Sequence, residues 1–131
     1  MMEHERLMYQ IIGAVSEMDA PIVFKGALIT KLILAENGYT AFQRPTVDID
    51  ANWVGMPPKM EELVCTINRS LASFNGEFYA EARREYGEKK SAGIAIAEAA
   101  TGSRIVSMDI SIKPVAGSKV YFYGKWELRA S

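Results

Sequence analysis

The stretch Thr46–Val54 reads Thr-Val-Asp-Ile-Asp-Ala-Asn-Trp-Val, and polar and apolar side chains alternate along most of it. Because successive side chains of a β-strand point to opposite faces, this alternation predicts a strand with one buried and one polar face. The polar face carries Asp48, Asp50 and Asn52. Aspartate is a poor strand former, and two carboxylates roughly 7 Å apart on one face repel each other unless a cation lies between them. A pattern that costs stability in this way is typical of a functional site.

The chain before this strand predicts two helices and a short strand. Apolar side chains recur at three- and four-residue spacing over Leu7–Met18, which predicts an amphipathic helix. The proline of Asp19-Ala20-Pro21 ends this helix, because proline disfavours the helical conformation in the residue before it. The run Ile22–Phe24 predicts a buried strand, Lys25-Gly26 a turn, and Ala27–Glu36 a second helix.

The chain after this strand predicts one helix and then strands only. A third helix is predicted to begin at Pro57-Pro58 and to end at Asn75-Gly76. The predicted strands are Phe78–Tyr86, Ala92–Glu98, Arg104–Lys113 and Lys119–Tyr123. Helices that come early and consecutive strands that come late predict an α+β fold, with a mixed β-sheet backed by helices on one face.

The composition bounds the class of protein. A chain of 131 residues with 49% hydrophobic and 24% charged residues predicts one folded domain, residues 1–131, and excludes a disordered chain. The net charge of -1 provides no general attraction for nucleic acid, so such a partner would need a local basic patch or metal-bridged contacts. No apolar stretch is long enough to cross a bilayer. The single cysteine, Cys65, fits a reducing cytoplasm, and its apolar neighbours predict a small buried side chain.

Two further features point to phosphate chemistry. At Lys25-Gly26-Ala27 a predicted strand gives way to a helix, whose free N-terminal amides and dipole favour a phosphate group. Glycine lets the backbone approach a ligand closely, and the lysine adds a positive charge. Asp109 lies on a later strand between the small residues Ser107 and Ser111, which leave room for an ion or a substrate. A phosphate cradle and three carboxylates are the parts that phosphoryl transfer with two Mg²⁺ ions uses.

These residues carry a family resemblance. A strand ending in glycine, a helix, Asp-x-Asp on the next strand and a later strand aspartate resemble the polymerase-β-like nucleotidyltransferase superfamily. The segments Phe24–Leu28 (Phe-Lys-Gly-Ala-Leu) and Arg44–Asp50 (Arg-Pro-Thr-Val-Asp-Ile-Asp) more specifically resemble the abortive-infection AbiEii toxin family. That family shows Lys-Gly-Gly-Thr-Ala-Leu and Arg-x-[Ser/Thr]-x-Asp-Ile-Asp. The resemblance covers about residues 22–113 and implies a minimal nucleotidyltransferase domain.

The resemblance implies roles for individual residues. The metal-binding and catalytic residues would be Asp48, Asp50 and Asp109. The nucleotide-binding residues would be Lys25, Gly26, Ala27, Arg44 and Thr46. The implied cofactor is Mg²⁺ or Mn²⁺, the implied donor an NTP, and the implied acceptor a hydroxyl group, with RNA and the tRNA 3′ end as candidates. Relatives resemble toxins of toxin–antitoxin systems, so an antitoxin protein and a second copy of the chain are the expected protein partners.

The sequence departs from the family pattern in two places, and two other functions stay open. Ala27 replaces the second glycine or serine, so no hydroxyl is available there. The family usually continues into a helical domain with a Lys-x-x-Ala-type motif, for which Gly124–Leu128 would be the lead-in. A truncated or degenerate, non-catalytic nucleotide-binding or interaction protein of the same fold is one alternative. A metal-dependent phosphoesterase is the other, although His4 is the sole histidine. The charged run Glu81–Lys90 is interpreted as a solvated hairpin because acids are interleaved in it, and contact of its Arg83, Arg84, Lys89 and Lys90 with RNA is the alternative.

Overall fold

The computed structural model describes residues 3–18, 20–26, 48–87, 90–113, 119–123 and 126–130. The predicted helix Ala27–Glu36 lies outside the described residues. So do three of the predicted nucleotide-binding residues, Ala27, Arg44 and Thr46.

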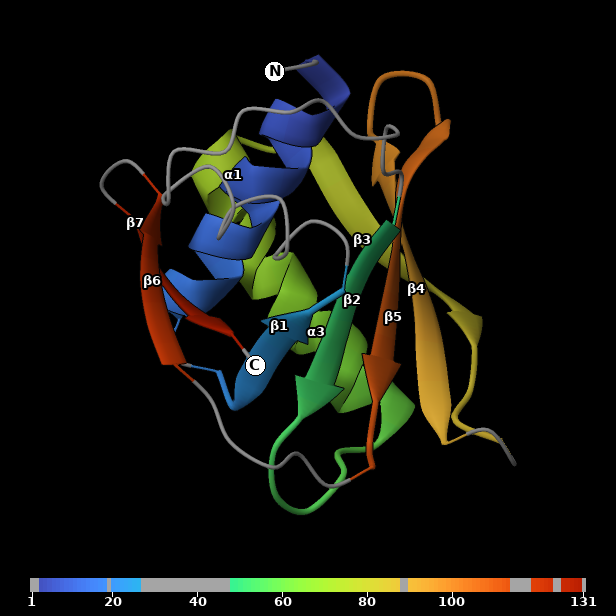
Figure 1. Ribbon diagram of the computed structural model, residues 1–131. Helices are drawn as coiled ribbons and strands as arrows, with labels where there is room; N and C mark the ends of the chain where they lie inside the picture. The colour runs from blue at the N-terminus through green and yellow to red at the C-terminus, as the bar shows by residue number, and fades with distance from the viewer. Residues whose placement is uncertain are drawn as a thin grey trace.

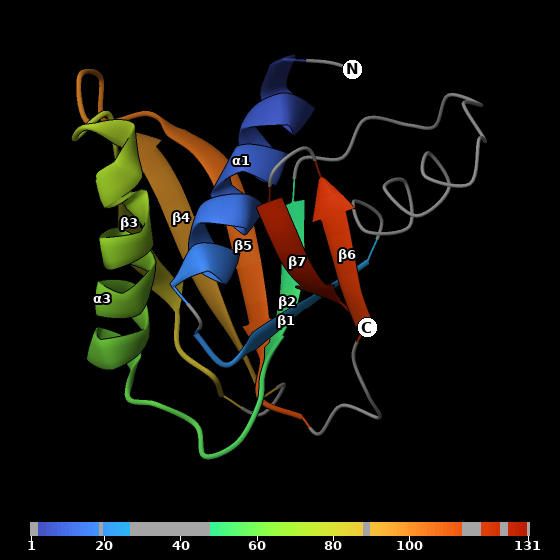
Figure 2. The same cartoon turned by 90° about the vertical axis from the view of Figure 1, so that its left-hand side faces the viewer.

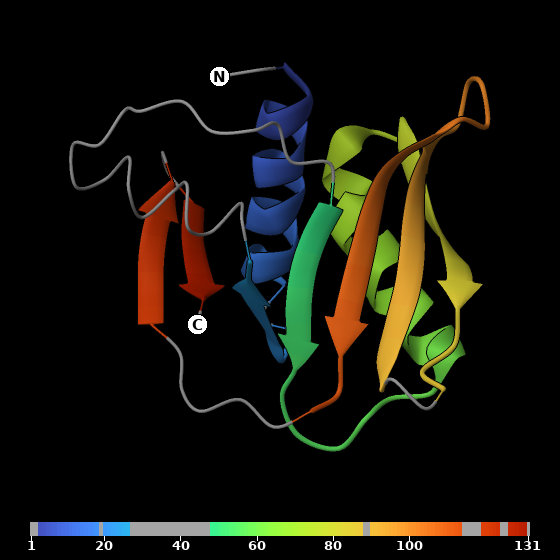
Figure 3. The same cartoon turned by 45° about the vertical axis from the view of Figure 1, so that its right-hand side comes forward.

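The described strands form one mixed sheet. They are β1 (Ile22–Lys25), β2 (Asp48–Trp53), β3 (Phe78–Arg84), β4 (Ser91–Glu98), β5 (Arg104–Ser111), β6 (Lys119–Tyr123) and β7 (Trp126–Ala130). Their order across the sheet is β3-β4-β5-β2-β1-β7-β6, which can be followed in Figure 3. Strand β2 runs parallel to β5 and β1 parallel to β7, whereas the other neighbours are antiparallel. The predicted α+β class with a mixed sheet is confirmed.

The two described α-helices lie on the same face of the sheet. Helix α1 (Glu3–Glu17) and helix α3 (Met60–Ser70) lie behind the strands in Figure 1 and side by side in Figure 2. Helix α3 begins later than predicted, because Lys59 is extended at its N-terminus and the proline pair only leads into it. A 3₁₀ turn, η1 (Leu71–Phe74), follows α3, and Asn75 then ends the helical segment in a left-handed conformation, as predicted. None of the described helices is long and apolar enough to cross a membrane.

The hydrophobic core lies between these helices and the sheet. Its fully buried large side chains include Met8, Ile11, Ile12, Phe24, Ile49, Leu63, Ile67, Leu71, Ile94 and Ile96. Burying one such side chain stabilises the fold by about 1.5–3 kcal/mol. The alternation predicted for β2 and β5 is confirmed, since Ile49 and Met108 are buried while Asp50 and Asp109 are partly exposed on the other face. The face of the sheet away from α1 and α3 therefore carries the predicted acids.

The outer strand β3 is tied to helix α3 by one side chain. The Asn68 amide group donates to the Ala80 carbonyl at 3.1 Å, and its oxygen accepts from the Ala80 amide at 2.8 Å. Both backbone groups belong to a strand at the end of the sheet, where unpaired groups invite association with other chains. Asn68 therefore provides hydrogen-bond partners for both backbone groups of Ala80 at the sheet edge.

The strand β7 was not among the predicted elements. The segment Gly124–Leu128 was expected to lead into a further helical region, but residues 126–130 pair with β6 along their length and with β1 at Phe24 and Ala130. This segment is therefore an inner strand of the sheet rather than a connection.

Candidate active site

A row of five paired residues crosses the polar face of the sheet. Lys25 of β1 pairs with Asp50 of β2, and Asp50 pairs with Asp109 of β5. The row continues from Asp109 to Gly93 of β4 and from Gly93 to Arg84 of β3. Residues paired in register point to the same face, and neighbouring strands lie about 5 Å apart. The fold thus brings two predicted acids together and places a basic residue at each end of the row.

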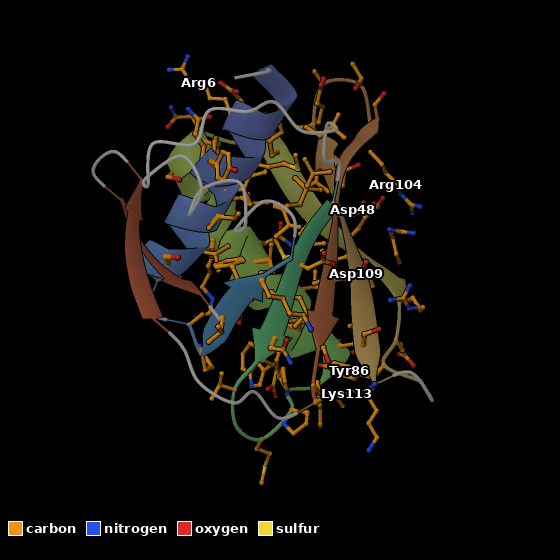
Figure 4. The ribbon with its side chains drawn as sticks, in the orientation of Figure 1. Arg6, Asp48, Tyr86, Arg104, Asp109 and Lys113 are labelled. Atoms are coloured by element: carbon orange, nitrogen blue, oxygen red, sulfur yellow. The ribbon has the colours of Figure 1, made fainter. Side chains whose placement is uncertain are left out.

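The third predicted acid lies on the same face. Asp48 is exposed and pairs with Ser107 of β5, two residues before the pairing of Asp50 with Asp109. Figure 4 places Asp48 at the start of β2 and Asp109 farther along the adjacent β5. All three predicted acids are therefore on two adjacent parallel strands, with Ser107 as the small neighbour that the sequence suggested.

Gly26 packs directly against the carboxylate of Asp50. Its φ of +87° is a backbone conformation that residues with side chains rarely adopt. A Cβ atom at this position would lie 2.6 Å from Asp50 Oδ2 and 3.1 Å from Asp50 Cβ. Glycine is therefore required here both for the turn after β1 and for the position of Asp50. The predicted contact of Gly26 with phosphate stays a prediction.

The acids form a cluster that disfavours further negative charge. Burial raises the pKa of Asp50 above 3.8, and the neighbouring charges of Asp109 and Asp48 raise it further. The positive charge of Lys25 lowers the pKa of Asp50, but by less than the other effects together raise it. The lysine predicted to bind nucleotide therefore lies close enough to act on the central acid.

The donor set of this cluster suits a hard divalent cation. Carboxylate oxygens are the ligands that Mg²⁺ prefers, and a cation would relieve the repulsion that raises the Asp50 pKa. Within the described ranges, no three carboxylate, histidine or cysteine side chains yet converge as a complete set of metal ligands. One of the carboxylate oxygens of Asp109 accepts a hydrogen bond from Arg84.

Two arginines that the sequence did not assign to this site contact residues of the acidic face. Arg84 Nη2 donates to Asp109 Oδ1 at 3.0 Å and to Ser91 Oγ at 3.2 Å. Arg83 Nη1 donates to Ser107 Oγ at 2.8 Å. Both arginines are exposed on the hairpin of β3 and β4, as the interpretation of this charged run as a solvated hairpin predicts, and their side chains also contact residues of the acidic face. Alternation along β3 gave no signal, because a register shift between Ala82 and Arg84 interrupts it.

A hollow in the described part of the surface lies away from the acids. An open groove of about 580 Å³ between α3 and β3 is lined by residues such as Val64, Cys65 and Ala82, and none of the three acids lines it. The prediction that Cys65 is buried is wrong, because its side chain is exposed on this groove. The turn of the helix sets its exposure, since Leu63 and Ile67 of the same helix take the buried positions.

Comparison with known proteins supports the fold. No family model matches the sequence, and no curated protein matches it. Among solved structures, the chain is similar to MenT4, a nucleotidyltransferase toxin from Mycobacterium tuberculosis, with a TM-score of 0.55 and 17% sequence identity. The alignment covers 97% of this chain and 47% of that one, so the chain spans about half the length of MenT4. Membership of the AbiEii family stays a prediction. The chain has a nucleotidyltransferase-like fold, and the acids lie together on its polar face.

Proposed function

We propose that this chain is a metal-dependent nucleotidyltransferase, which moves a nucleotidyl group from an NTP to a hydroxyl acceptor. The pairing of Asp50 with Asp109 on adjacent parallel strands is the observation that carries the proposal. It places two carboxylates from distant parts of the chain side by side, with Asp48 on the same face. Lys25 lies beside this pair, and Gly26 lies against the central carboxylate.

In this proposal the three acids hold Mg²⁺ or Mn²⁺. When bound, such ions stabilise the attacking and leaving oxygens of a phosphoryl transfer. Asp109 orients the acceptor hydroxyl and accepts its proton. The hydroxyl oxygen forms a bond to the α-phosphorus while the bond to the leaving pyrophosphate breaks. Lys25 and the turn at Gly26 face the donor phosphates. We assign the same role to Ala27, Arg44 and Thr46 from the family resemblance alone.

We further propose that the acceptor is RNA, with tRNA included, and that the chain acts as a cytoplasmic toxin controlled by an antitoxin protein. The toxin role is supported by the similarity to a protein described as a nucleotidyltransferase toxin. Induced expression in a bacterial host should arrest growth, and Asp50→Asn should restore it. Continued growth with the unaltered chain would count against the toxin role without bearing on transfer itself.

A non-catalytic nucleotide-binding protein of the same fold is the second candidate. The observation that favours it is that the alignment covers 47% of MenT4, so about half of that protein has no counterpart in the alignment. Under this alternative an NTP binds with Mg²⁺ but no group is transferred.

The test incubates the chain with each labelled NTP, Mg²⁺ and total RNA and scores the label on RNA. Asp50→Asn and Asp109→Asn should abolish transfer. Glu81→Gln is the matched control, because Glu81 is an acid of the outer strand β3 that forms an ion pair with Arg104 and lies outside the row. Release of pyrophosphate identifies transfer, whereas release of phosphate identifies a phosphoesterase. Transfer that survives Asp50→Asn would refute the proposal, and binding without transfer would favour the second candidate.

A further inference from the structure

We propose that Arg84, supported by Arg83, binds the triphosphate of the donor nucleotide by exchanging its bond to Asp109 for bonds to phosphate. This inference rests on the proposed function, because it assumes that a triphosphate enters the site. It adds two residues of β3 to a site that the sequence placed on β1, β2 and β5 only.

Strand β3 contains a bulge beside Arg84. Ala82 pairs with Ile94, but Arg84 pairs with Gly93, so one residue of β3 is additional. A bulge sets two consecutive residues opposite one and can turn both toward the same face. A Cβ atom on Gly93 would lie 3.4 Å from the Arg84 Cβ and 3.5 Å from the Arg83 Cβ. Both arginines therefore leave the strand on the face that carries the acids.

Gly93 of β4 lies between Arg84 and Asp109 in the row. The guanidinium carbon of Arg84 lies 3.5 Å from the position that a Gly93 Cβ would take. Arg84 thus extends over β4 and reaches Asp109 on the next strand at 3.0 Å. A larger side chain at Gly93 would occupy this path, so the glycine makes the contact between β3 and β5 available.

Arg84 retains hydrogen-bond donors that its contacts with described residues do not use. Its hydrogen bonds to other described residues both come from Nη2, which leaves its Nε and Nη1 hydrogens for a ligand. A guanidinium presents its donors as a planar fork that fits a phosphate in a bidentate manner. The Arg84 side chain is 47% exposed, so a ligand can approach it from solvent.

The ion pair between Arg84 and Asp109 can be exchanged for another partner at little cost in stability. An ion pair between exposed side chains contributes little to stability, so Arg84 can leave Asp109 without disrupting the sheet. A cation held by Asp50 and Asp109 competes with Arg84 for the same carboxylate. The triphosphate that accompanies the cation then offers Arg84 a phosphate group with which its guanidinium can form two parallel hydrogen bonds. Arg83, bonded to Ser107, adds a second positive charge beside it.

The first experiment measures binding by calorimetry, with Mg²⁺ present throughout and inorganic tripolyphosphate or each NTP as the probe. Arg84→Ala should weaken binding about 10- to 100-fold, the range expected for lost charge-assisted hydrogen bonds. Arg84→Lys keeps the positive charge but loses the planar fork of donors. Its affinity for the probe should therefore fall between that of the unaltered chain and that of Arg84→Ala. Arg104→Ala is the matched control, because that arginine pairs with Glu81 at 2.6 Å on the same sheet and should leave the affinity unchanged.

The second experiment measures binding of Mn²⁺ alone by electron paramagnetic resonance. Arg84→Ala removes the cation that competes for Asp109, so Mn²⁺ should bind about two- to five-fold more tightly. The inference therefore predicts opposite changes for metal and triphosphate. A structural role for Arg84 would instead weaken both, and such a result would overturn the inference.

The outcomes separate this inference from the proposed function. If the unaltered chain binds tripolyphosphate or an NTP and Arg84→Ala and Arg84→Lys bind it equally well, this inference fails while the proposed function survives. If the unaltered chain binds none of these probes with Mg²⁺, both fail. Unfolding of Arg84→Ala would leave Arg84→Lys as the deciding variant, and undiminished binding by that variant would overturn the role of the fork.

Discussion

Replacing Gly26 with alanine tests the link between the turn after β1 and the central acid. The added Cβ would lie 2.6 Å from Asp50 Oδ2, so the carboxylate must move. A left-handed backbone at a residue with a side chain costs about 1–2 kcal/mol. Forcing Asp50 away from its preferred rotamer adds about 0.5–1.5 kcal/mol. We therefore expect Gly26→Ala to lower the free energy of unfolding by about 1.5–3.5 kcal/mol.

Urea unfolding followed by circular dichroism measures this loss. With a slope of about 1–3 kcal/mol per molar urea, the midpoint should fall by about 1 M or more. Gly76→Ala provides the control, because Gly76 has a similar φ of +80° and nothing within 4 Å of its Cβ position. The loss of stability in Gly76→Ala therefore reports the cost of the left-handed backbone alone. Any further loss of stability in Gly26→Ala reports the contact with Asp50.

A double-mutant cycle identifies the contact further. In an Asp50→Ala background the carboxylate is absent, and Gly26→Ala should lose only slightly more stability than Gly76→Ala loses in the unaltered chain. The coupling between Gly26 and Asp50 should be about 1 kcal/mol, within the range found for residues in contact. A Gly26→Ala variant as stable as Gly76→Ala, or a cycle with no coupling, would refute the proposed packing of the turn against the acid.

Three further predictions follow from other contacts. The pKa of Asp50 is raised above 3.8, so the folded state binds the proton of this carboxyl more tightly than the unfolded state does. The free energy of unfolding therefore falls as the pH rises through the folded pKa of Asp50. Asp50→Asn should therefore be more stable than the unaltered chain in urea at pH 7, and this advantage should shrink near pH 4. Asn68→Ala leaves both edge groups of Ala80 without their partner, and it should lower the free energy of unfolding by about 1–3 kcal/mol and promote aggregation in light scattering. Ile94→Ala, at a fully buried position, should lower the free energy of unfolding in urea by about 2–5 kcal/mol, and a loss below 1 kcal/mol would contradict its place in the core.

Much of the fold could be predicted because its signals are local. The alternation around Asp48 and Asp50, and the apolar spacing of α1, are set by which face each residue must bury. Strand β7 carried such a signal too, since Trp126–Ala130 alternates between apolar and polar residues. That alternation was outweighed by the expectation that this segment leads into a helical region.

The rest depends on pairing between distant segments. Asp50 lies beside Asp109 because β2 and β5 run parallel in one register, and nothing in either segment alone specifies that register. Arg83 and Arg84 face the acids because of a bulge, which shifts the face of every later residue by one. A charged run on an outer strand gives no sign of such a shift, so its arginines resemble solvated surface residues in the sequence.

The charges along the row explain how the site can persist without a ligand. Asp50 and Asp109 are adjacent, and two carboxylates at this spacing oppose folding unless positive charges lie nearby. Lys25 lies on one side of the pair and Arg84 on the other, so the four formal charges cancel. A divalent cation bound between the acids would leave the row with excess positive charge. A triphosphate supplies negative charge that offsets this excess, and Arg84, which the cation releases from Asp109, is the side chain placed to receive it.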